Sequence, residues 1–183
     1  PPSMVTDLRW GSGSNWNSTI ENFKKYDYSS SARFENGKSI LFDISGDNSS
    51  SINISSDIAP SVVYAMCPLG HDFTWSGNGK MSGTMNLWKS MNGTLTVNKD
   101  LDYTGTTVIS EGTMAINGKL AGRLDLRAKG TLAGNPILND TILFEGALNY
   151  EGCRLSPGTS DAPYGVITSN KSMTLPGKVF IEE

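Results

Sequence analysis

A short phrase of glycine, threonine and an aliphatic residue returns between residues 83 and 158, and it restricts the fold more than any other feature. The phrase occurs at Gly83-Thr84-Met85, Gly93-Thr94-Leu95, Gly112-Thr113-Met114 and Gly130-Thr131-Leu132, and the series closes on Gly152-Cys153-Arg154-Leu155. From Gly93 the glycines are separated by 19, 18 and 22 residues (93 to 112, 112 to 130, 130 to 152), at or near solenoid periods. Because so short a unit cannot bury its own apolar face, the units are expected to stack on one another.

The strands expected within the repeats are about five residues long, with aliphatic side chains at alternate positions. Leu95 and Val97 form one such pair, and Met114 and Ile116 form another. Alternation directs one set of side chains inward and the other outward. Stacking in register therefore predicts an aliphatic ladder inside, Thr or Asn ladders outside, and corner glycines with positive φ. A sandwich built from hairpins would also give short strands, but the repeated phrase favours a β-solenoid.

A chain of 183 residues is long enough for one domain with a continuous core. The prediction is a single β-solenoid domain over residues 1–183, with an N-terminal cap over 1–39 and coils over 40–183. The cap segment is rich in Ser, Asn and aromatic residues, which would cover the first open coil. Residues 173–183 stop within a strand-like pattern, which favours a piece of a larger secreted protein over a complete processed one.

The composition is typical of an extracellular β-rich protein with many turns, because only 18% of residues are charged and glycine numbers 20. A net charge of −3 with scattered basic residues provides no footprint for nucleic acid, which is excluded as a partner. No run approaches the roughly 20 apolar residues of a membrane span. The two cysteines, Cys67 and Cys153, match no metal spacing; two buried thiols are the favoured interpretation, and a disulfide is the alternative.

Candidate catalytic and metal-binding groups are few. His71-Asp72 holds the single histidine, and without a nucleophile elbow it is interpreted as a solvated turn. The segment Gly77-Asn78-Gly79-Lys80 lacks the ending of a phosphate-binding loop. Carboxylates that could serve glycoside hydrolysis are interpreted as outer-face charges: Glu111, Asp125, Glu145 and Glu151. Residues 123–127 read as a strand whose outward side carries alternating charge. No metal or cofactor is predicted; turn residues Asp43, Asp47, Asp57 and Asn139-Asp140 lack a calcium-binding repeat.

Aromatic residues are the remaining candidates for ligand contact, because an exposed ring can stack on the apolar face of a sugar. Those at or near predicted turns are Trp75, Trp88, Tyr103, Tyr150 and Tyr164. The predicted carbohydrate-binding set is Trp88, Tyr103, Trp75 and Tyr150, with Trp88 the leading candidate. For Trp75, as for Trp10 and Trp16, a place in the cap or core is the favoured alternative.

An ordered series of phrases along nearly the whole chain resembles the autotransporter-associated β-strand repeat proteins. The first phrases are Trp10-Gly11, Asn15-Trp16, Phe34 with Gly37, Ile40-Leu41-Phe42-Asp43, Pro60-Ser61-Val62-Val63 and residues 73–83. The most specific phrases span residues 87–97 and 103–114, and Leu-Ser-Pro-Gly closes the series at residues 155–158. Trp88 and Ser90-Met91 depart from the family, which prefers small residues or Gly there, and Cys153-Arg154 interrupts its usual Gly-Thr-Leu.

The resemblance implies a right-handed parallel β-helix that is secreted by, or displayed on the surface of, a Gram-negative bacterium. In this family the repeat is a scaffold, found in adhesin-like passengers and beside polysaccharide-degrading enzymes, and a fold alone does not specify chemistry. The predicted function is a non-catalytic module of a larger protein that contacts a polysaccharide or cell-surface glycan, or spaces a neighbouring polysaccharide-degrading domain. A structural or adhesive passenger segment is the alternative, and a polysaccharide lyase or hydrolase is the second alternative.

Overall fold

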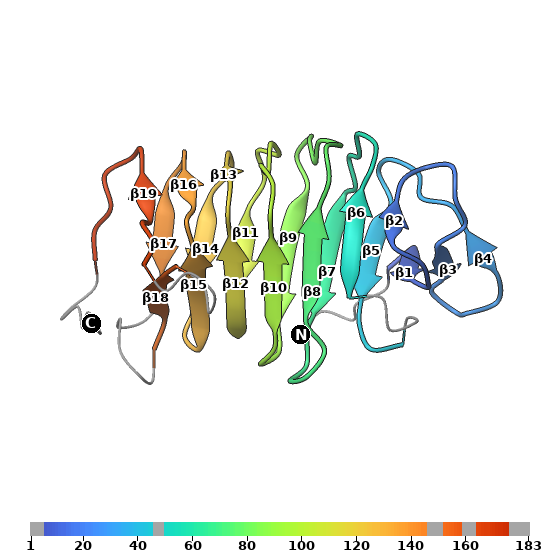
Figure 1. Ribbon diagram of the computed structural model, residues 1–183, viewed down its shortest axis with the longest axis horizontal. Coiled ribbons are helices and arrows are strands. Elements are labelled where there is room, and N and C mark those ends of the chain that lie inside the picture. Colours follow the sequence, from blue (N-terminus) through green and yellow to red (C-terminus); the bar gives the residue numbers. More distant parts are fainter. Residues whose placement is uncertain (1–5, 46–49, 146–151, 159–163, 176–183) are drawn as a thin grey trace.

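The chain is an all-β solenoid of about five turns (Figure 1), as the sequence predicts. The computed structural model describes residues 6–45, 50–145, 152–158 and 164–175, and every regular element within them is a β-strand. Successive turns stand side by side along the long axis, in the order of the chain, from the N-terminal end to the C-terminal end. Three sheets, here called A, B and C, run along this axis and enclose the core.

Sheet A has nine strands in the spatial order β17-β14-β11-β9-β7-β5-β1-β3-β4. Their bounds are β1 Leu8–Trp10, β3 Phe23–Lys25, β4 Ser31–Ala32, β5 Ser39–Phe42, β7 Val62–Met66, β9 Asn86–Ser90, β11 Thr107–Ile109, β14 Leu124–Leu126 and β17 Ile142–Phe144. From β1 to β17 the neighbouring strands of this ladder are parallel.

Sheet B has seven strands in the order β18-β15-β12-β10-β8-β6-β2, and sheet C has three in the order β13-β16-β19. The strands of sheet B are β2 Asn15–Trp16, β6 Ser51–Ile54, β8 Phe73–Ser76, β10 Thr94–Val97, β12 Gly112–Ile116, β15 Gly130–Gly134 and β18 Arg154–Pro157. Those of sheet C are β13 Lys119–Leu120, β16 Ile137–Leu138 and β19 Thr168–Ser169. Parallel bridges from Ile58 to Met81 and from Leu101 to Leu120 continue this third side toward the N-terminus.

From Gly93 onward the glycine-threonine phrase stacks in register on sheet B, as predicted, whereas Gly83-Thr84-Met85 precedes β9 of sheet A. Thr113 pairs with Thr94 on one side and with Thr131 on the other, which confirms the steps of 19 and 18 residues. The next positions, Leu95, Met114 and Leu132, are buried one above another as the inner aliphatic ladder. The last step differs from the prediction, because Thr131 pairs with Arg154 and so Gly152 is not the register partner of Gly130.

Two kinds of glycine form the corners of the coils. Gly83 and Gly112 have positive φ values of 83° and 68°, a backbone region that glycine enters without strain. At Gly105 and Gly122 a side chain is excluded because the preceding coil approaches closely. A Cβ atom on Gly105 would lie 1.9 Å from the carbonyl oxygen of Met85, and one on Gly122 would lie 2.1 Å from that of Gly105.

Asp and Asn side chains at the turns link each coil to the next. The Oδ1 atoms of Asp57, Asn86 and Asp100 accept hydrogen bonds from backbone N–H groups one turn later, each at 2.8 Å. The donors are Lys80, Thr106 and Lys119. The predicted asparagine ladder is also present, because Nδ2 of Asn117 donates to Oδ1 of Asn98 at 2.8 Å. Such bonds satisfy turn backbone groups that the sheets leave unpaired.

An aromatic cap closes the N-terminal end of the solenoid. Strands β3 and β4 add to sheet A in antiparallel fashion beyond β1. Behind them Trp10 meets Phe23 edge-on with ring centroids 5.1 Å apart, and Trp16 meets Phe34 edge-on at 5.7 Å. All four side chains are buried. The parallel ladder already includes β1 and β2, so the first coil begins within the segment 1–39 that was expected to be cap.

Candidate functional site

The outer side of sheet A carries a continuous row of side chains in register, here called the sheet A row. Its members, from the cap onward, are Arg9, Leu41, Tyr64, Trp88, Val108, Asp125 and Leu143. Each occupies the strand position that alternates with buried inward residues. Neighbouring strands of a sheet are about 4.8 Å apart, so the row is a close-spaced line across the strands.

Tyr64 and Trp88 place two aromatic rings on neighbouring strands at the middle of the row. Both side chains are half-buried and contribute surface to the outside of the sheet. The next member, Val108, faces outward but is only 3% exposed. Polar residues without charge flank the rings, with Asn86 and Ser90 two positions from Trp88 along the same strand. The middle of the row is thus apolar, aromatic and uncharged.

The guanidinium group of Arg127 lies over the ring of Trp88, 5.0 Å from its centroid. Arg127 follows β14, and the register places Val108 of β11 between that strand and Trp88. Nε of Arg127 also lies 3.4 Å from Oε2 of Glu145. This pairing combines a cation–π contact with an exposed ion pair, each worth at most about 1 kcal/mol in such a setting. Part of the Trp88 ring is therefore covered by a side chain held through surface contacts alone.

The alternating strand predicted at residues 123–127 is present as β14. Leu124 and Leu126 are buried, whereas Asp125 points outward and its Oδ1 lies 3.1 Å from Nε of Arg123. The interpretation of Asp125 as an outer-face charge is consistent with this pairing.

The structure separates the four aromatic residues of the predicted carbohydrate-binding set. Trp88 lies at the surface, but Trp75 and Tyr103 are fully buried, so their assignment to a sugar-binding surface is corrected. Trp75 faces inward in β8 and packs edge-on against Trp16, with ring centroids 5.8 Å apart. Tyr150 lies outside the described residues.

Tyr103 is enclosed at the corner that leads into β11. Its hydroxyl group shares a hydrogen bond of 2.6 Å with Oγ1 of Thr107, which is also buried. Burial raises the pKa of Tyr103 far above its ordinary value, with the Thr107 bond opposing the shift. Tyr103 is a satisfied polar residue of the core. Tyr164, in contrast, is 94% exposed and far along the chain from the sheet A row.

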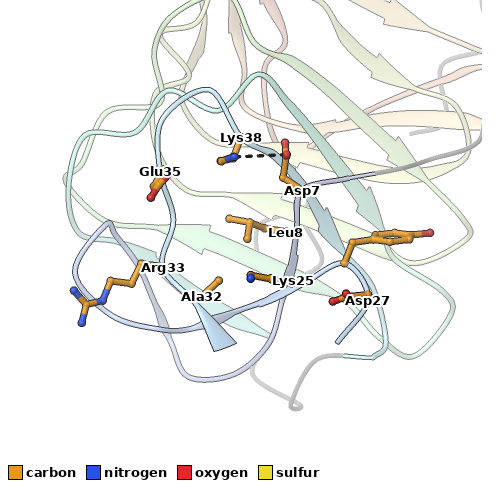
Figure 2. A pocket seen from close by; sticks show the side chains of 9 residues that line it. Asp7, Leu8, Lys25, Asp27, Ala32, Arg33, Glu35 and Lys38 are labelled. Carbon is orange, nitrogen blue, oxygen red and sulfur yellow. Dashed lines mark ion pairs between the residues drawn. The ribbon is translucent and has the colours of Figure 1, made fainter. Parts of the chain in front are cut away.

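The cap carries an open cavity of about 640 Å³ beside β1, β3 and β4 (Figure 2). Its lining is formed by three carboxylates, three cations and three other side chains: Asp7, Asp27, Glu35, Lys25, Arg33, Lys38, Leu8, Tyr26 and Ala32. Nζ of Lys38 lies 3.7 Å from Oδ1 of Asp7. Backbone and side-chain hydrogen bonds from Ser39 lower the pKa of Asp7. The lining charges cancel, and the cavity is wide open to solvent.

Lys89 is a fully buried cation on the inward side of β9. Its Nζ atom donates to the carbonyl oxygens of Met91 at 2.8 Å, Glu111 at 3.0 Å and Ser90 at 3.2 Å. A Cβ atom on Gly112 would lie 2.9 Å from this nitrogen. Burial lowers the pKa of Lys89, although the three carbonyls stabilise its charged form. The ammonium group closes a corner of the solenoid and does not reach the sheet A row.

The other polar candidates have structural partners. His71 is exposed at a turn, and Oδ1 of Asp72 accepts the backbone N–H of Thr94 at 2.6 Å. A Cβ atom on Gly79 would lie 2.1 Å from the carbonyl oxygen of Ser56, so coil stacking accounts for this glycine. Within the described residues no group of three or more His, Cys, Asp or Glu side chains converges as a metal site.

Both cysteines belong to the apolar core. Cys67 and Cys153 are fully buried, and Cys67 is a free thiol, which confirms the prediction of buried thiols over a disulfide between them. Burial raises the pKa of Cys67 to about 12. The thiolate form is therefore scarce near neutral pH.

The geometry defines a β-solenoid protein with an aromatic cap and, at the middle of the sheet A row, an uncharged stretch that carries two aromatic rings. Comparisons of the chain with family models, curated proteins and solved structures returned no match. Among the described residues there is also no helix with the length and apolar character needed to cross a membrane.

Proposed function

We propose that this chain is a non-catalytic module of a larger secreted or surface protein and that it contacts carbohydrate through the sheet A row. The observation that carries the proposal is the pair Tyr64 and Trp88, two half-exposed rings in register on neighbouring strands. Flat aromatic surfaces can stack on the apolar faces of sugar rings, while nearby amides and hydroxyls bond their hydroxyl groups.

The phrases of the sequence add a finer proposal, that the solenoid is an autotransporter-associated repeat of a Gram-negative bacterium. Such a scaffold would present the row outside the cell, next to a neighbouring domain of the same polypeptide. The regular stack, with its turn side chains bonded from coil to coil, also favours a second candidate function as a structural spacer or adhesive passenger segment. A spacer needs the stack but not the rings.

Affinity electrophoresis tests the carbohydrate proposal. The folded 183-residue chain is run in gels that contain plant or host polysaccharides, and at least one polymer is expected to retard it. Trp88→Ala should abolish or weaken the retardation, whereas Tyr164→Ala, which removes an exposed ring outside the row, should leave it unchanged. Circular dichroism of each variant controls for folding. A wild-type chain that no polymer retards would contradict the proposal and leave the spacer function.

An activity assay on the same polymers separates the module from the lyase or hydrolase alternative. No turnover is expected from the isolated chain. Turnover that disappears in Asp125→Asn would overturn the non-catalytic assignment, since Asp125 is the outward carboxylate of the row.

A further inference from the structure

The charges around the sheet A row also point to the class of its ligand. Resting on the proposed function, we infer that the row binds an uncharged linear polysaccharide whose chain runs along the solenoid axis, across the strands. Two independent features carry this inference, namely the distribution of charge on the outer side of sheet A and the direction of the line through the two rings.

The outward positions of β7 and β9, and Val108 of β11, carry no charged side chain. Charges begin at the borders of this patch, and there each cation has an anion beside it. Arg9 pairs with Asp43 at the cap end. At the other end Arg123 pairs with Asp125 and Arg127 with Glu145, so the two arginines and two carboxylates sum to zero.

A charged polymer would find no complementary field on such a surface. A polyuronate approaching Arg127 would also meet Glu145 and Asp125, and it would have to give up hydration without gaining an unpaired cation. An uncharged polymer avoids this cost, because stacking on the rings and hydrogen bonds to residues such as Asn86 and Ser90 need no counter-charge.

The direction of the ligand follows from the register. Tyr64 and Trp88 are direct partners on parallel strands, so the line joining them runs perpendicular to the strands. Leu41 and Val108 continue that line at its two ends, but each is only 3% exposed, so the two rings are the accessible part of the line. The four positions span roughly 14 Å at the usual separation of strands. A ligand lying along a single strand would meet only one of the two rings.

The test compares polymers that share a backbone and differ in charge, such as hydroxyethyl and carboxymethyl cellulose, or methyl-esterified and de-esterified galacturonan. The neutral member of at least one pair should retard the protein more than its charged counterpart. This retardation should persist as the salt concentration is raised, because binding of a neutral polymer involves no ion pair that salt could screen. Tyr64→Ala and Trp88→Ala should each lower the affinity by up to about tenfold.

Arg127→Gln supplies the matched control, because it removes the cation over Trp88 and keeps an uncharged polar side chain that can still donate hydrogen bonds. Affinity for the neutral polymer should be retained or increased in this variant. The inference of a neutral ligand would be overturned if the charged polymers bound more tightly, if salt weakened that binding, and if Arg127→Gln abolished it. Carbohydrate contact itself would then still hold. Sensitivity to Trp88→Ala but not to Tyr64→Ala would overturn the axial orientation. Absence of retardation by every polymer would overturn the proposed function itself.

Discussion

A lysine enclosed in the core shows how one side chain can complete a corner of this fold. Lys89 alternates with Trp88 along β9 and therefore points inward, next to the buried Leu87. Its hydrogen bonds satisfy the carbonyl groups of Met91 and Glu111 where the chain turns, and add a second donor to the carbonyl of Ser90, which also accepts the backbone N–H of Cys67. The period-two pattern alone would have placed Lys89 inside, but a lysine at an inward position usually argues against burial.

Lys89→Met should destabilise the protein by about 3 kcal/mol, because a side chain of similar length leaves the carbonyl oxygens of Met91 and Glu111 without the ammonium donor. Urea unfolding followed by circular dichroism measures the change. Lys119→Met is the matched control, since this lysine is exposed and its replacement should alter stability by less than about 0.5 kcal/mol. Equal stability of the two variants would show that water or a shifted backbone satisfies the carbonyls.

The carboxylate of Asp7 should make the free energy of unfolding depend on pH. Its carboxylate accepts the backbone N–H and the hydroxyl of Ser39, each at 2.8 Å, which lowers its pKa from the ordinary 3.8. A folded-state pKa below the unfolded value adds stability above about pH 4, and this stability is lost as pH falls through the folded-state pKa. The stability difference between wild type and Asp7→Asn should thus be small but largest near neutral pH, and it should vanish once the pH has fallen below the folded-state pKa of Asp7. A difference independent of pH would contradict this assignment.

Sequence reasoning found one half of the aromatic pair and missed the other. Trp88 was identified because it stands where the resembling family has a small residue, and the structure places it at the surface. Tyr64 is not among the residues predicted to contact a ligand, although its alternation with Val63 and Ala65 indicates an outward ring. Trp75 and Tyr103 were placed near turns, but closeness to a turn does not decide on which side of the coil a side chain points.

The turn elements were the least predictable parts of the coils. The repeated phrase correctly indicated short parallel strands, because strand pairing follows from a repeated pattern with period two. It could not indicate that Asp57, Asn86 and Asp100 would bond backbone groups one turn later. Those bonds join residues 19 to 23 positions apart, and the pairs become visible only once the register is known.

Gly122→Ala tests the close approach between corner elements. The added Cβ atom would lie 2.1 Å from the carbonyl oxygen of Gly105, so the two coils must separate locally. The expected cost is about 3 kcal/mol or more, at the upper end for overpacking. Gly70→Ala is the control, because it meets no atom within 4 Å and only its φ of 84° is unfavourable, at a cost of about 1 kcal/mol. Thermal unfolding of both variants measures the difference. A smaller loss of stability for Gly122→Ala than for Gly70→Ala would show that the backbone at this corner can shift at little cost.

The whole molecule is a stack in which each coil contacts chiefly the coils before and after it. The strands β9 to β12 have a sheet partner on both sides, whereas β17, β18 and β4 are at the ends of their sheets within the described residues. In such an array the stability of a segment depends on how many neighbours it has.

Hydrogen exchange should therefore be graded along the axis. Backbone amides of β9 to β12 are expected to exchange most slowly, and those of β17 and β4 several times faster, because an end coil can open by losing one interface. Exchange followed by proteolysis and mass spectrometry resolves these segments. Uniform rates from one end to the other would mean that the solenoid opens only as a single cooperative unit.

The distribution of tryptophan gives the molecule two separate optical signals. Three of its four tryptophans, Trp10, Trp16 and Trp75, are buried around the cap, and the fourth, Trp88, is half-exposed on sheet A. The buried indoles should emit at shorter wavelengths than Trp88, and no indole follows residue 88. Opening of the C-terminal coils alone would leave the emission of the three buried indoles nearly unchanged while ellipticity falls, and would alter only the Trp88 component, because Arg127 leaves its ring. A sugar bound on the row would likewise perturb only the long-wavelength component.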